Sequence, residues 1–254
     1  MTALAVGSYQ LCWRALRETI RQPGVEVSNL FIPLFFFFVT VGAISNVAGP
    51  AFGVDNYEGF QLPVAVLQCV AGSASVSGIA LIRDIESGYF DKLLLTPSPR
   101  LAIVLGRLFA DAIRAIAFTA VILFVVSLVG AGMEAGPFGY AVILALAGLF
   151  GLAYSGIGAT IALRTGNAQA AQAGFLLFFP LLFLSPAFAP KEVFDPWMEF
   201  LASINPVTYL LEGMRTLVLE GWQWDNLAGA VGAVLGLGVV TVALSLWALR
   251  ARTR

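Results

Sequence analysis

Histidine is absent from this chain of 254 residues, and cysteine occurs only twice. The lack of histidine excludes Ser–His and Cys–His nucleophilic centres and histidine metal ligands. Lysine is almost as scarce, and neither Lys92 nor Lys191 follows a glycine-rich run, so the chain lacks a phosphate-binding loop. We therefore expect a protein that is not an enzyme, that holds no metal and that has no nucleotide site of its own.

Charged side chains are also few: 11% of the residues are charged, whereas 59% are hydrophobic. This composition excludes a soluble globular domain of this length and indicates an integral membrane protein. Apolar windows of the length that crosses a ~30 Å hydrocarbon core cover residues 30–47, 60–82, 112–132, 138–163, 168–189 and 227–249. The sequence thus predicts an all-α integral membrane protein with six transmembrane helices, in a single transmembrane domain over residues 1–254.

Positive charges are distributed unevenly about these spans. Of the fourteen arginine and lysine residues, only Lys191 and Arg215 fall on the side opposite the termini, and twelve fall on the side of the termini. Short cytoplasmic loops carry an excess of positive residues. We therefore expect a multi-pass protein of the plasma membrane, in a bacterium the inner membrane, with both termini in the cytoplasm.

The N-terminal segment, residues 1–24, is amphipathic rather than uniformly apolar. Its helical spacing places Tyr9, Cys12 and Trp13 on one face and three arginines on the other. Aromatic residues flanked by arginines are typical of the membrane interface. We predict an N-terminal amphipathic helix that lies on the membrane surface.

Two further segments interrupt the pattern of spans. Residues 83–100 form a charged, proline-containing block on the cytoplasmic side. Residues 190–225 are divided by Pro190, Pro196 and Pro206 into stretches that are too short to cross a membrane. We predict an extracellular re-entrant hairpin before the last helix; an amphipathic loop on the outer leaflet is the alternative.

The third window begins with the one cluster of ionisable residues near the spans. Arg107, Asp111 and Arg114 follow at spacings that share one helical face. An ion-pair ladder at the interface, with the arginines reaching the cytoplasm, is one interpretation. A role in gating or coupling is the other.

Two motifs carry a family resemblance. The first lies in the cytoplasmic block and reads Glu86-x-Gly88, Leu93-Leu94 and Thr96-Pro97. The second reads Asn205-Pro206-x-Thr208-Tyr209, with Arg215 downstream. Together with the order of the segments, these motifs resemble the type-2 permeases of ATP-binding-cassette (ABC) exporters, including the daunorubicin-resistance-like group. That family often has threonine after the glycine, where this chain has Tyr89.

The resemblance implies that a separate cytoplasmic ABC ATPase, in two copies, binds ATP and Mg²⁺ and drives transport, so that this chain itself holds no cofactor. It implies a cytoplasmic coupling helix that inserts into the ATPase, with the residues Glu86, Gly88, Asp91, Lys92, Thr96 and Pro97. It also implies an outer exit gate with the residues Asn205, Pro206, Thr208, Tyr209 and Arg215. A solvated loop that only fixes topology is the alternative for the cytoplasmic block.

Aromatic and polar residues within the spans are candidates for a substrate path. The candidates are Phe35, Phe38, Gln68, Gln172, Phe175 and Phe179. Phenylalanines would suit a hydrophobic or amphipathic molecule in a cavity formed by a dimer. Phenylalanine in a span also commonly faces lipid, and glutamine also bonds neighbouring helices.

The predicted function is that of a permease subunit that moves a hydrophobic or amphipathic drug-like molecule or lipid out of the cell. It would pair with a second copy or a paralogous permease in the lipid bilayer, and it would bind no nucleic acid. Export of a lipid-linked glycan or polysaccharide is the alternative within the family. A non-transporting membrane scaffold or anchor subunit is the alternative from another class. A stand-alone channel is disfavoured because no ring of charge and no filter motif occurs.

Overall fold

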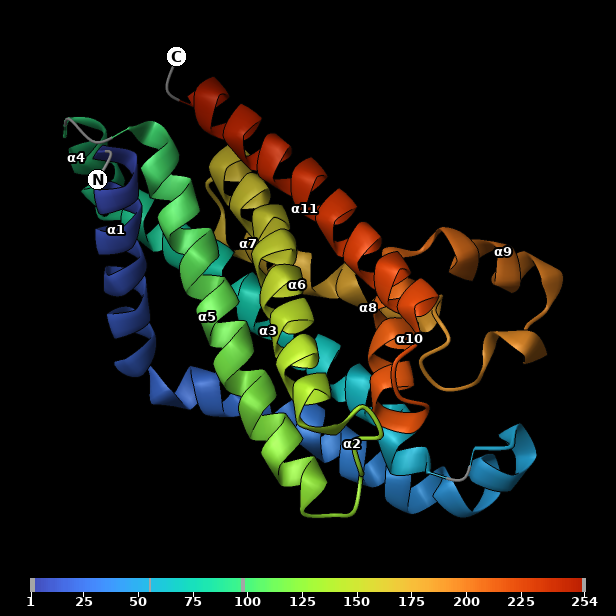
Figure 1. Ribbon diagram of the computed structural model, residues 1–254. Helices are drawn as coiled ribbons and strands as arrows, with labels where there is room; N and C mark the ends of the chain where they lie inside the picture. Colours follow the sequence, from blue (N-terminus) through green and yellow to red (C-terminus); the bar gives the residue numbers. More distant parts are fainter. Residues whose placement is uncertain (1–2, 55, 97–98, 253–254) are drawn as a thin grey trace.

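The computed structural model describes residues 3–54, 56–96 and 99–252, except for the side chains at positions 172 and 173. Helices account for the regular structure of these residues, and no strand occurs among them (Figure 1). The helices are α1 (Ala3–Ile20), α2 (Pro23–Phe52), α3 (Tyr57–Glu86), α4 (Tyr89–Leu94), α5 (Arg100–Ser127), α6 (Gly136–Thr165), α7 (Ala168–Leu176), α8 (Phe178–Phe183), the 3₁₀ helix η1 (Lys191–Val193), α9 (Pro196–Ile204), α10 (Pro206–Leu219) and α11 (Trp224–Arg252). The predicted all-α architecture is confirmed.

Five helices in the described part of the chain are long and apolar enough to cross a membrane: α2, α3, α5, α6 and α11. Each has 28 to 30 residues, which at ~1.5 Å per residue exceeds the ~30 Å hydrocarbon core. Five of the six predicted spans therefore correspond to helices of this kind. The exception is the window at residues 168–189, which does not form one continuous helix.

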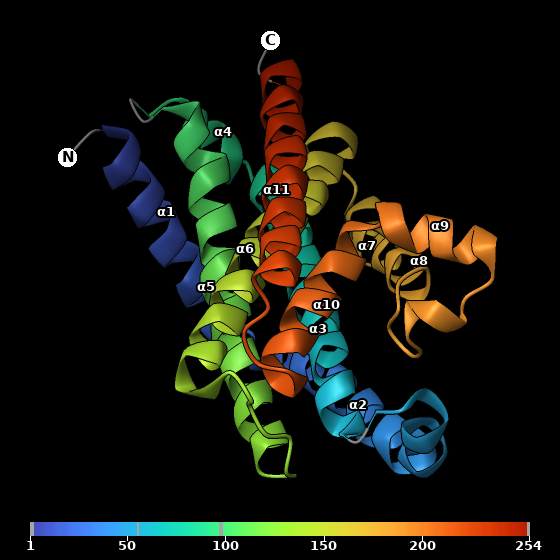
Figure 2. The same cartoon turned by 45° about the vertical axis from the view of Figure 1, so that its right-hand side comes forward.

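That window is divided into α7 and α8, with a turn at Leu177 between them. Pro180 supplies a physical reason, because proline has no amide hydrogen to donate to the carbonyl of residue 176 and its ring crowds that carbonyl. The two short helices lead the chain from the end of α6 toward the start of α11 (Figures 1 and 2). As a result, the start of α1 and the last turn of α11 lie at the same end of the bundle (Figure 1).

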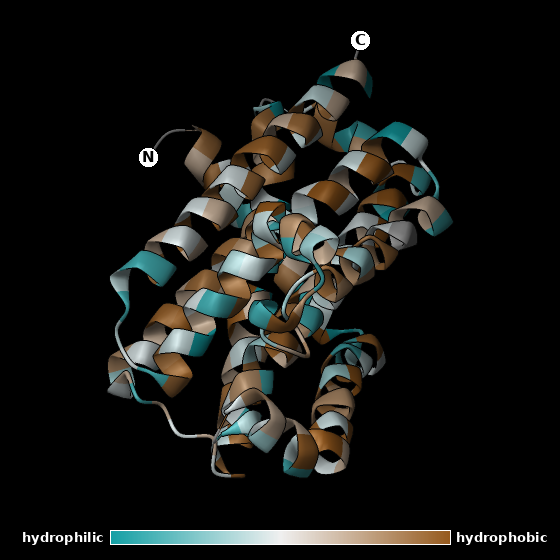
Figure 3. Ribbon diagram, turned by 90° about the vertical axis from the view of Figure 1, so that its right-hand side faces the viewer, coloured by the Kyte–Doolittle hydropathy of each residue, from teal (hydrophilic) through white to brown (hydrophobic). Residues whose placement is uncertain are grey.

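Helix α3 forms the centre of the bundle. It contacts α2, α5, α6, α7 and α10, and most of its side chains are buried. Helices α2 and α11 lie at the periphery, and most of their hydrophobic side chains are exposed. Hydrophobic residues accordingly appear along the outer surfaces of the helices as well as inside (Figure 3). This is the pattern of a protein whose surroundings are lipid.

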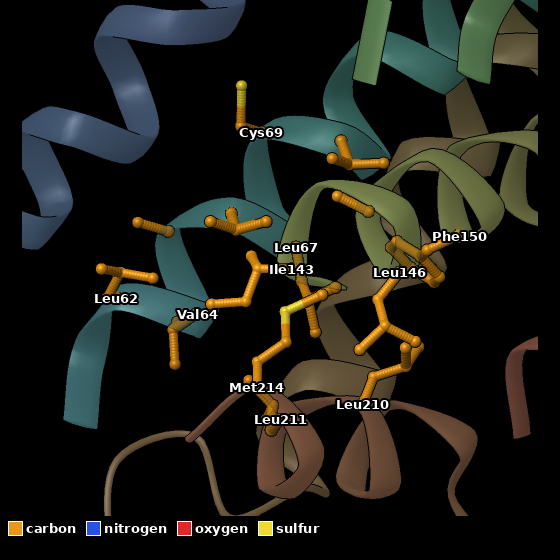
Figure 4. Packing of buried hydrophobic residues seen from close by; sticks show 14 of the residues in the cluster. Leu62, Val64, Leu67, Cys69, Ile143, Leu146, Phe150, Leu210, Leu211 and Met214 are labelled. Carbon is orange, nitrogen blue, oxygen red and sulfur yellow. The ribbon is translucent and has the colours of Figure 1, made fainter. Parts of the chain in front are cut away.

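The short helix α10 contributes to the hydrophobic core around α3. Side chains from α3, α6 and α10 converge, as Figure 4 shows for Leu67, Leu146, Leu210, Leu211 and Met214. All five are buried. Helix α10 is therefore packed into the bundle, whereas η1 and α9 before it are mostly exposed.

Helix α1 packs along α5. A side chain at Gly106 of α5 would come within 2.8 Å of Leu11 Cβ and of the Ser8 carbonyl oxygen, so this glycine permits the close approach. Tyr9 and Trp13 of the predicted apolar face are exposed. Cys12, assigned to the same face from the sequence, is instead buried in the protein.

Helices α3 and α6 cross at two glycines, and this contact yields a test of the fold. A Cβ atom at Gly78 would lie 2.9 Å from the Gly158 carbonyl oxygen, a backbone atom that cannot move aside. Gly78→Ala is expected to lower the free energy of unfolding by about 1–3 kcal/mol, measured by denaturation in detergent micelles. Gly158→Ala is the matched control, because its Cβ would meet nothing closer than 3.6 Å. Equal effects of the two substitutions would contradict the crossing.

Candidate functional site

The predicted coupling region is a short helix between two turns. Helix α3 ends at Glu86, Gly88 has a φ of +69° and α4 begins at Tyr89. An L side chain at position 88 would be strained in this left-handed conformation. Helix α4 lies at the end of the bundle that holds the start of α1 and the last turn of α11 (Figures 1 and 2). Gly88 therefore turns the chain so that α4 covers one end of the bundle.

Two aromatic side chains fix the inner face of α4. Phe90 is only 1% exposed and packs in a cluster with residues of α3 and α5 such as Ile82 and Leu108. The guanidinium of Arg14 in α1 lies 3.9 Å from the centre of the Tyr89 ring, a cation–π contact. Tyr89 thus joins α4 to α1.

The predicted coupling side chains lie on α4 and at its two ends: Asp91 and Lys92 belong to α4, Glu86 ends α3 and Thr96 follows α4. Glu86, Asp91, Lys92 and Thr96 are all exposed, and so is Leu95. Pro97 lies outside the described residues. Four predicted coupling residues are therefore exposed on or next to α4, whereas Phe90 anchors α4 to the bundle.

Behind α4, a buried carboxylate joins three helices. Asp84 of α3 accepts hydrogen bonds from Arg14 of α1 at 3.0 Å and from Arg107 of α5 at 2.9 Å. Glu18 of α1 lies 3.9 Å from Arg107. The hydrogen bond to Asp84 raises the pKa of Arg14, so this guanidinium remains charged. Ion pairs thus connect α1, α3 and α5 next to α4.

A second buried group lies deeper along the same face of α5. Arg114 donates to a carboxylate oxygen of Asp111 and, at 2.9 Å, to the Ser73 carbonyl oxygen. It also lies 3.4 Å from Glu26 at the start of α2. Arg107 pairs with Asp84 of α3 rather than with Asp111 of its own helix. Arg107 and Arg114 therefore bind neighbouring helices, and of the predicted ladder the Asp111–Arg114 pair forms within α5.

Cavities adjoin one another along α3 in the described part of the structure. The first, of about 150 Å³, lies between α1, α2, α3 and α5 and is lined by Arg107, Asp111 and Arg114. The second, of about 210 Å³, shares Val76 and Ile79 with the first. It lies between α2, α3 and α7.

A third cavity, of about 120 Å³, continues this series toward the other end of the bundle. It shares Pro33 and Gln68 with the second cavity. Its remaining lining is rich in aromatic residues from α2, α8 and the segment after α8: Phe36, Phe37, Phe179, Phe183 and Phe188. A charged cavity at one end is thus followed by apolar cavities along the same side of α3.

The structure brings three predicted path residues to these cavities. Gln68 lines the second and third cavities, Phe175 lines the second, and Phe179 lines the third. Phe35 and Phe38 are exposed on α2 and line none of the three. The side chain of Gln172 lies outside the described part.

Within the run Phe35 to Phe38, Phe36 and Phe37 line the third cavity. A run of four phenylalanines gives no signal for which ones point inward. Which of the four face the cavity depends on how α2 is rotated about its axis.

The outer motif is held together by short polar contacts. Asn205 caps α10: its side-chain oxygen accepts from the Val207 amide at 3.0 Å, and Pro206 follows at the first helical position. The Asn205 amide donates to the Leu181 carbonyl oxygen at 2.6 Å, which ties α10 to α8. Tyr209 donates to the Ser203 carbonyl oxygen at 2.6 Å, which ties α10 back to α9. Thr208 is buried beside the cap.

Arg215 completes this outer unit. The side chain is 8% exposed, and its guanidinium donates to three backbone carbonyl oxygens, those of Phe60 at 3.0 Å, Ala187 at 3.0 Å and Pro186. It also lies 3.5 Å from the centre of the Phe60 ring. All five residues predicted for the outer gate therefore belong to one packed unit that connects α10 with α3, α8 and α9.

This arrangement defines a multi-pass helical membrane protein with a short exposed helix at one end and a capped pair of helices before its last span. The ABC-2 type transporter family matches residues 8–219. The chain belongs to this family and is an ABC transporter permease. The family implies a cytoplasmic ABC ATPase as partner.

Several curated relatives are similar over most of the chain. A daunorubicin resistance ABC transporter permease protein from Streptomyces coeruleorubidus is 26% identical, with 91% of this chain and 80% of the relative covered. A probable doxorubicin resistance ABC transporter permease protein from Mycobacterium tuberculosis is 23% identical, with 94% and 87% covered. A probable multidrug ABC transporter permease from Escherichia coli is 25% identical, with 73% and 50% covered. These relatives are named as permeases, the transmembrane subunits of transporters, and not as enzymes.

Proposed function

We propose that this permease is the transmembrane subunit of an exporter that moves a hydrophobic or amphipathic drug-like molecule or lipid out of the cell. Two copies of a separate ATPase would bind ATP and Mg²⁺ and drive it, and a second permease, identical or paralogous, would complete the membrane part. The excess of arginine on the side of the termini supports a cytoplasmic position for both termini and for α4.

The observation that carries the proposal is the placement of α4. Phe90 and the contact between Tyr89 and Arg14 hold α4 against the bundle, whereas Asp91 and Lys92 of α4 and Glu86 just before it are exposed. A helix that is fixed to the bundle and exposes charged side chains can bind a partner protein. Movement of the partner would then displace α4 together with α1, α3 and α5. This is what coupling to an ATPase in a separate chain requires.

The cavities along α3 support an amphiphile as the substrate. Phenylalanine side chains dominate the lining of the third cavity, and Gln61 and Gln68 are among its few polar groups. Ligand sites of this composition suit apolar bodies with a few polar groups. The names of three relatives, which refer to daunorubicin, doxorubicin and multidrug permeases, agree with this class of substrate.

Substitution of Glu86 tests the coupling assignment. The permease would be co-purified with its ABC ATPase in lipid nanodiscs, and ATP hydrolysis would be measured with and without candidate amphiphiles. Because loss of one central charged contact at an interface often costs ~1 kcal/mol or more, Glu86→Ala should lower amphiphile-stimulated hydrolysis by about fivefold or more. Glu134→Ala is the matched control, since Glu134 is an exposed glutamate in the connection between α5 and α6.

The control variant should retain wild-type stimulation. If no ATPase associates with the permease, the coupling assignment fails and a non-transporting scaffold takes its place. If the complex forms but Glu86→Ala and Glu134→Ala behave alike, the outer surface of α4 is not the coupling surface.

A further inference from the structure

Helices α6 and α11 end side by side at the end of the bundle that also holds the start of α1 (Figure 1). Residues 135–190 and 226–254, which form α6, α7, α8 and most of α11, contain four arginines and no acidic residue. Between α1, α3 and α5, in contrast, Arg14 and Arg107 are paired with Asp84. The ends of α6 and α11 therefore carry positive charge that no carboxylate of the same segments neutralises.

Arg164 lies in the last turn of α6 and is exposed. Its guanidinium is 4.1 Å from the centre of the Trp247 ring of α11, and it forms no hydrogen bond or ion pair within the described residues. A guanidinium carries its N–H donors in one plane, in a fork that matches the oxygens of a phosphate group. Stacking on a ring occupies only the face of that plane, so the donors of Arg164 remain available to an anion.

Arg252 lies in the last turn of α11 and reaches the same end of α6. Its Nη1 atom donates to the Leu163 carbonyl oxygen at 3.2 Å, and its other nitrogens have no acceptor in the described part of the chain. The residue is exposed. Two guanidinium groups with unused donors, from different helices, thus lie at the last turn of α6.

An apolar face of α11 leads to these arginines. Val240, Leu244 and Trp247 are exposed, and their spacing of four and three residues places them on one side of the helix. In a helix that crosses a membrane, such a face contacts acyl chains, and tryptophan is enriched at the level of the headgroups. Arg164, which stacks on Trp247, and Arg252, which lies beyond it, are therefore at the depth of the lipid phosphates.

We propose that the adjoining ends of α6 and α11 bind an anionic phospholipid from the leaflet on the side of the termini. The guanidinium groups of Arg164 and Arg252 donate hydrogen bonds to the headgroup phosphate, and an acyl chain lies along Val240, Leu244 and Trp247. Basic pockets between transmembrane helices recognise anionic headgroups in this way. The three cavities described above are lined by other helices, so this lipid is a bound partner of the permease and the proposal does not depend on the export function.

Two lipids that differ only in their headgroups test this site. Palmitoyl-oleoyl phosphatidylglycerol carries a net negative charge, and palmitoyl-oleoyl phosphatidylcholine has the same acyl chains and no net charge. Binding of each lipid to the whole permease in detergent would be measured by native mass spectrometry. Arg164→Gln and Arg252→Gln should each weaken binding of phosphatidylglycerol by about fivefold, the usual effect of one arginine next to an anionic lipid. Binding of phosphatidylcholine should stay unchanged and so report that each variant is folded.

Arg17→Gln is the matched control. Arg17 is also an exposed arginine, and its guanidinium lies 5.3 Å from the centre of the Trp13 ring, but it belongs to α1. This variant should bind phosphatidylglycerol as the wild type does. Equal losses in Arg17→Gln and in the two site variants would show that binding follows total charge, and this result would overturn the site. Equal affinity of the wild type for the two lipids would overturn it as well.

Two further measurements distinguish the lipid from other occupants. The free headgroup, glycerophosphoglycerol, should compete only weakly, because it lacks the acyl chain that contacts α11. Competition as strong as that of the whole lipid would refute a lipid site and indicate a phosphate site. If Arg164→Gln and Arg252→Gln bind phosphatidylglycerol as the wild type does but no longer co-purify with the ABC ATPase, the arginines belong to a protein interface and the lipid site is refuted.

Discussion

Substitution of Asp84 by alanine is expected to lower the free energy of unfolding by about 3–5 kcal/mol, the range for breaking a buried ion pair from one side. Asp84 is 6% exposed and accepts hydrogen bonds from Arg14 and Arg107. Arg14 can turn toward solvent, but the Arg107 side chain is largely buried and would keep a hydrogen bond to Ser77 at 3.2 Å and, as its nearest carboxylate in an ion pair, Glu18 at 3.9 Å. The measurement is denaturant unfolding in detergent micelles.

A double variant separates charge from packing in this prediction. In Asp84→Leu combined with Arg107→Met, no buried charge is left without its partner, and apolar groups fill similar volumes. Such replacements are often nearly neutral, so the double variant should recover most of the stability that Asp84→Ala loses. If it is less stable than Asp84→Ala, the loss arises from packing and the ion-pair account is wrong.

The second large effect is expected at Arg215. Arg215→Met should destabilise the protein by about 3 kcal/mol, because it leaves buried carbonyl oxygens without a donor. The Pro186 carbonyl oxygen loses the hydrogen bond from Arg215. The Ala187 carbonyl oxygen also loses one but still accepts a hydrogen bond from the Gln61 side chain at 3.3 Å. The cation–π contact with Phe60 is lost as well. Thermal unfolding of the purified permease would measure the change.

Arg215→Lys is the informative comparison. Lysine keeps the charge but presents its donors from a single nitrogen, so it cannot span three carbonyl oxygens as a guanidinium does. Its stability should lie between that of the wild type and that of Arg215→Met. A lysine variant as stable as the wild type would show that charge alone, without the forked geometry, holds the segment at residues 186–187.

Much of the fold can be predicted from hydropathy and from the prolines that mark helix starts. Long apolar windows predict α2, α3, α5, α6 and α11, and the prolines at 196 and 206 mark the starts of α9 and α10. Hydropathy does not predict the break between α7 and α8. The average hydropathy of a window is unaffected by the backbone hydrogen bond that Pro180 cannot donate. Here local stereochemistry overrides the apolar composition.

The candidate sites were predictable to different degrees. The motif around Glu86 and Gly88 was visible because its turn needs a particular residue, and φ at Gly88 is indeed positive. The Asp111–Arg114 pair could be predicted from a helical wheel, but the partners of Arg107 and Arg114 on α2 and α3 could not, since a helical wheel shows only contacts within one helix. Asp84 is the clearest case: it pairs with residues 70 and 23 positions away, and only the packing of three helices brings them together.

The contacts of Arg215 have an evolutionary consequence. All three of its hydrogen-bond acceptors are main-chain oxygens, which any amino acid at positions 60, 186 and 187 would supply. The sequence at the acceptor positions can therefore drift while the contact persists. We expect no correlated substitutions between position 215 and positions 186 or 187, and no second-site suppressor of Arg215→Met at these two positions. A contact that joins distant segments can thus be indispensable and yet leave no pairwise trace in the variation of a family.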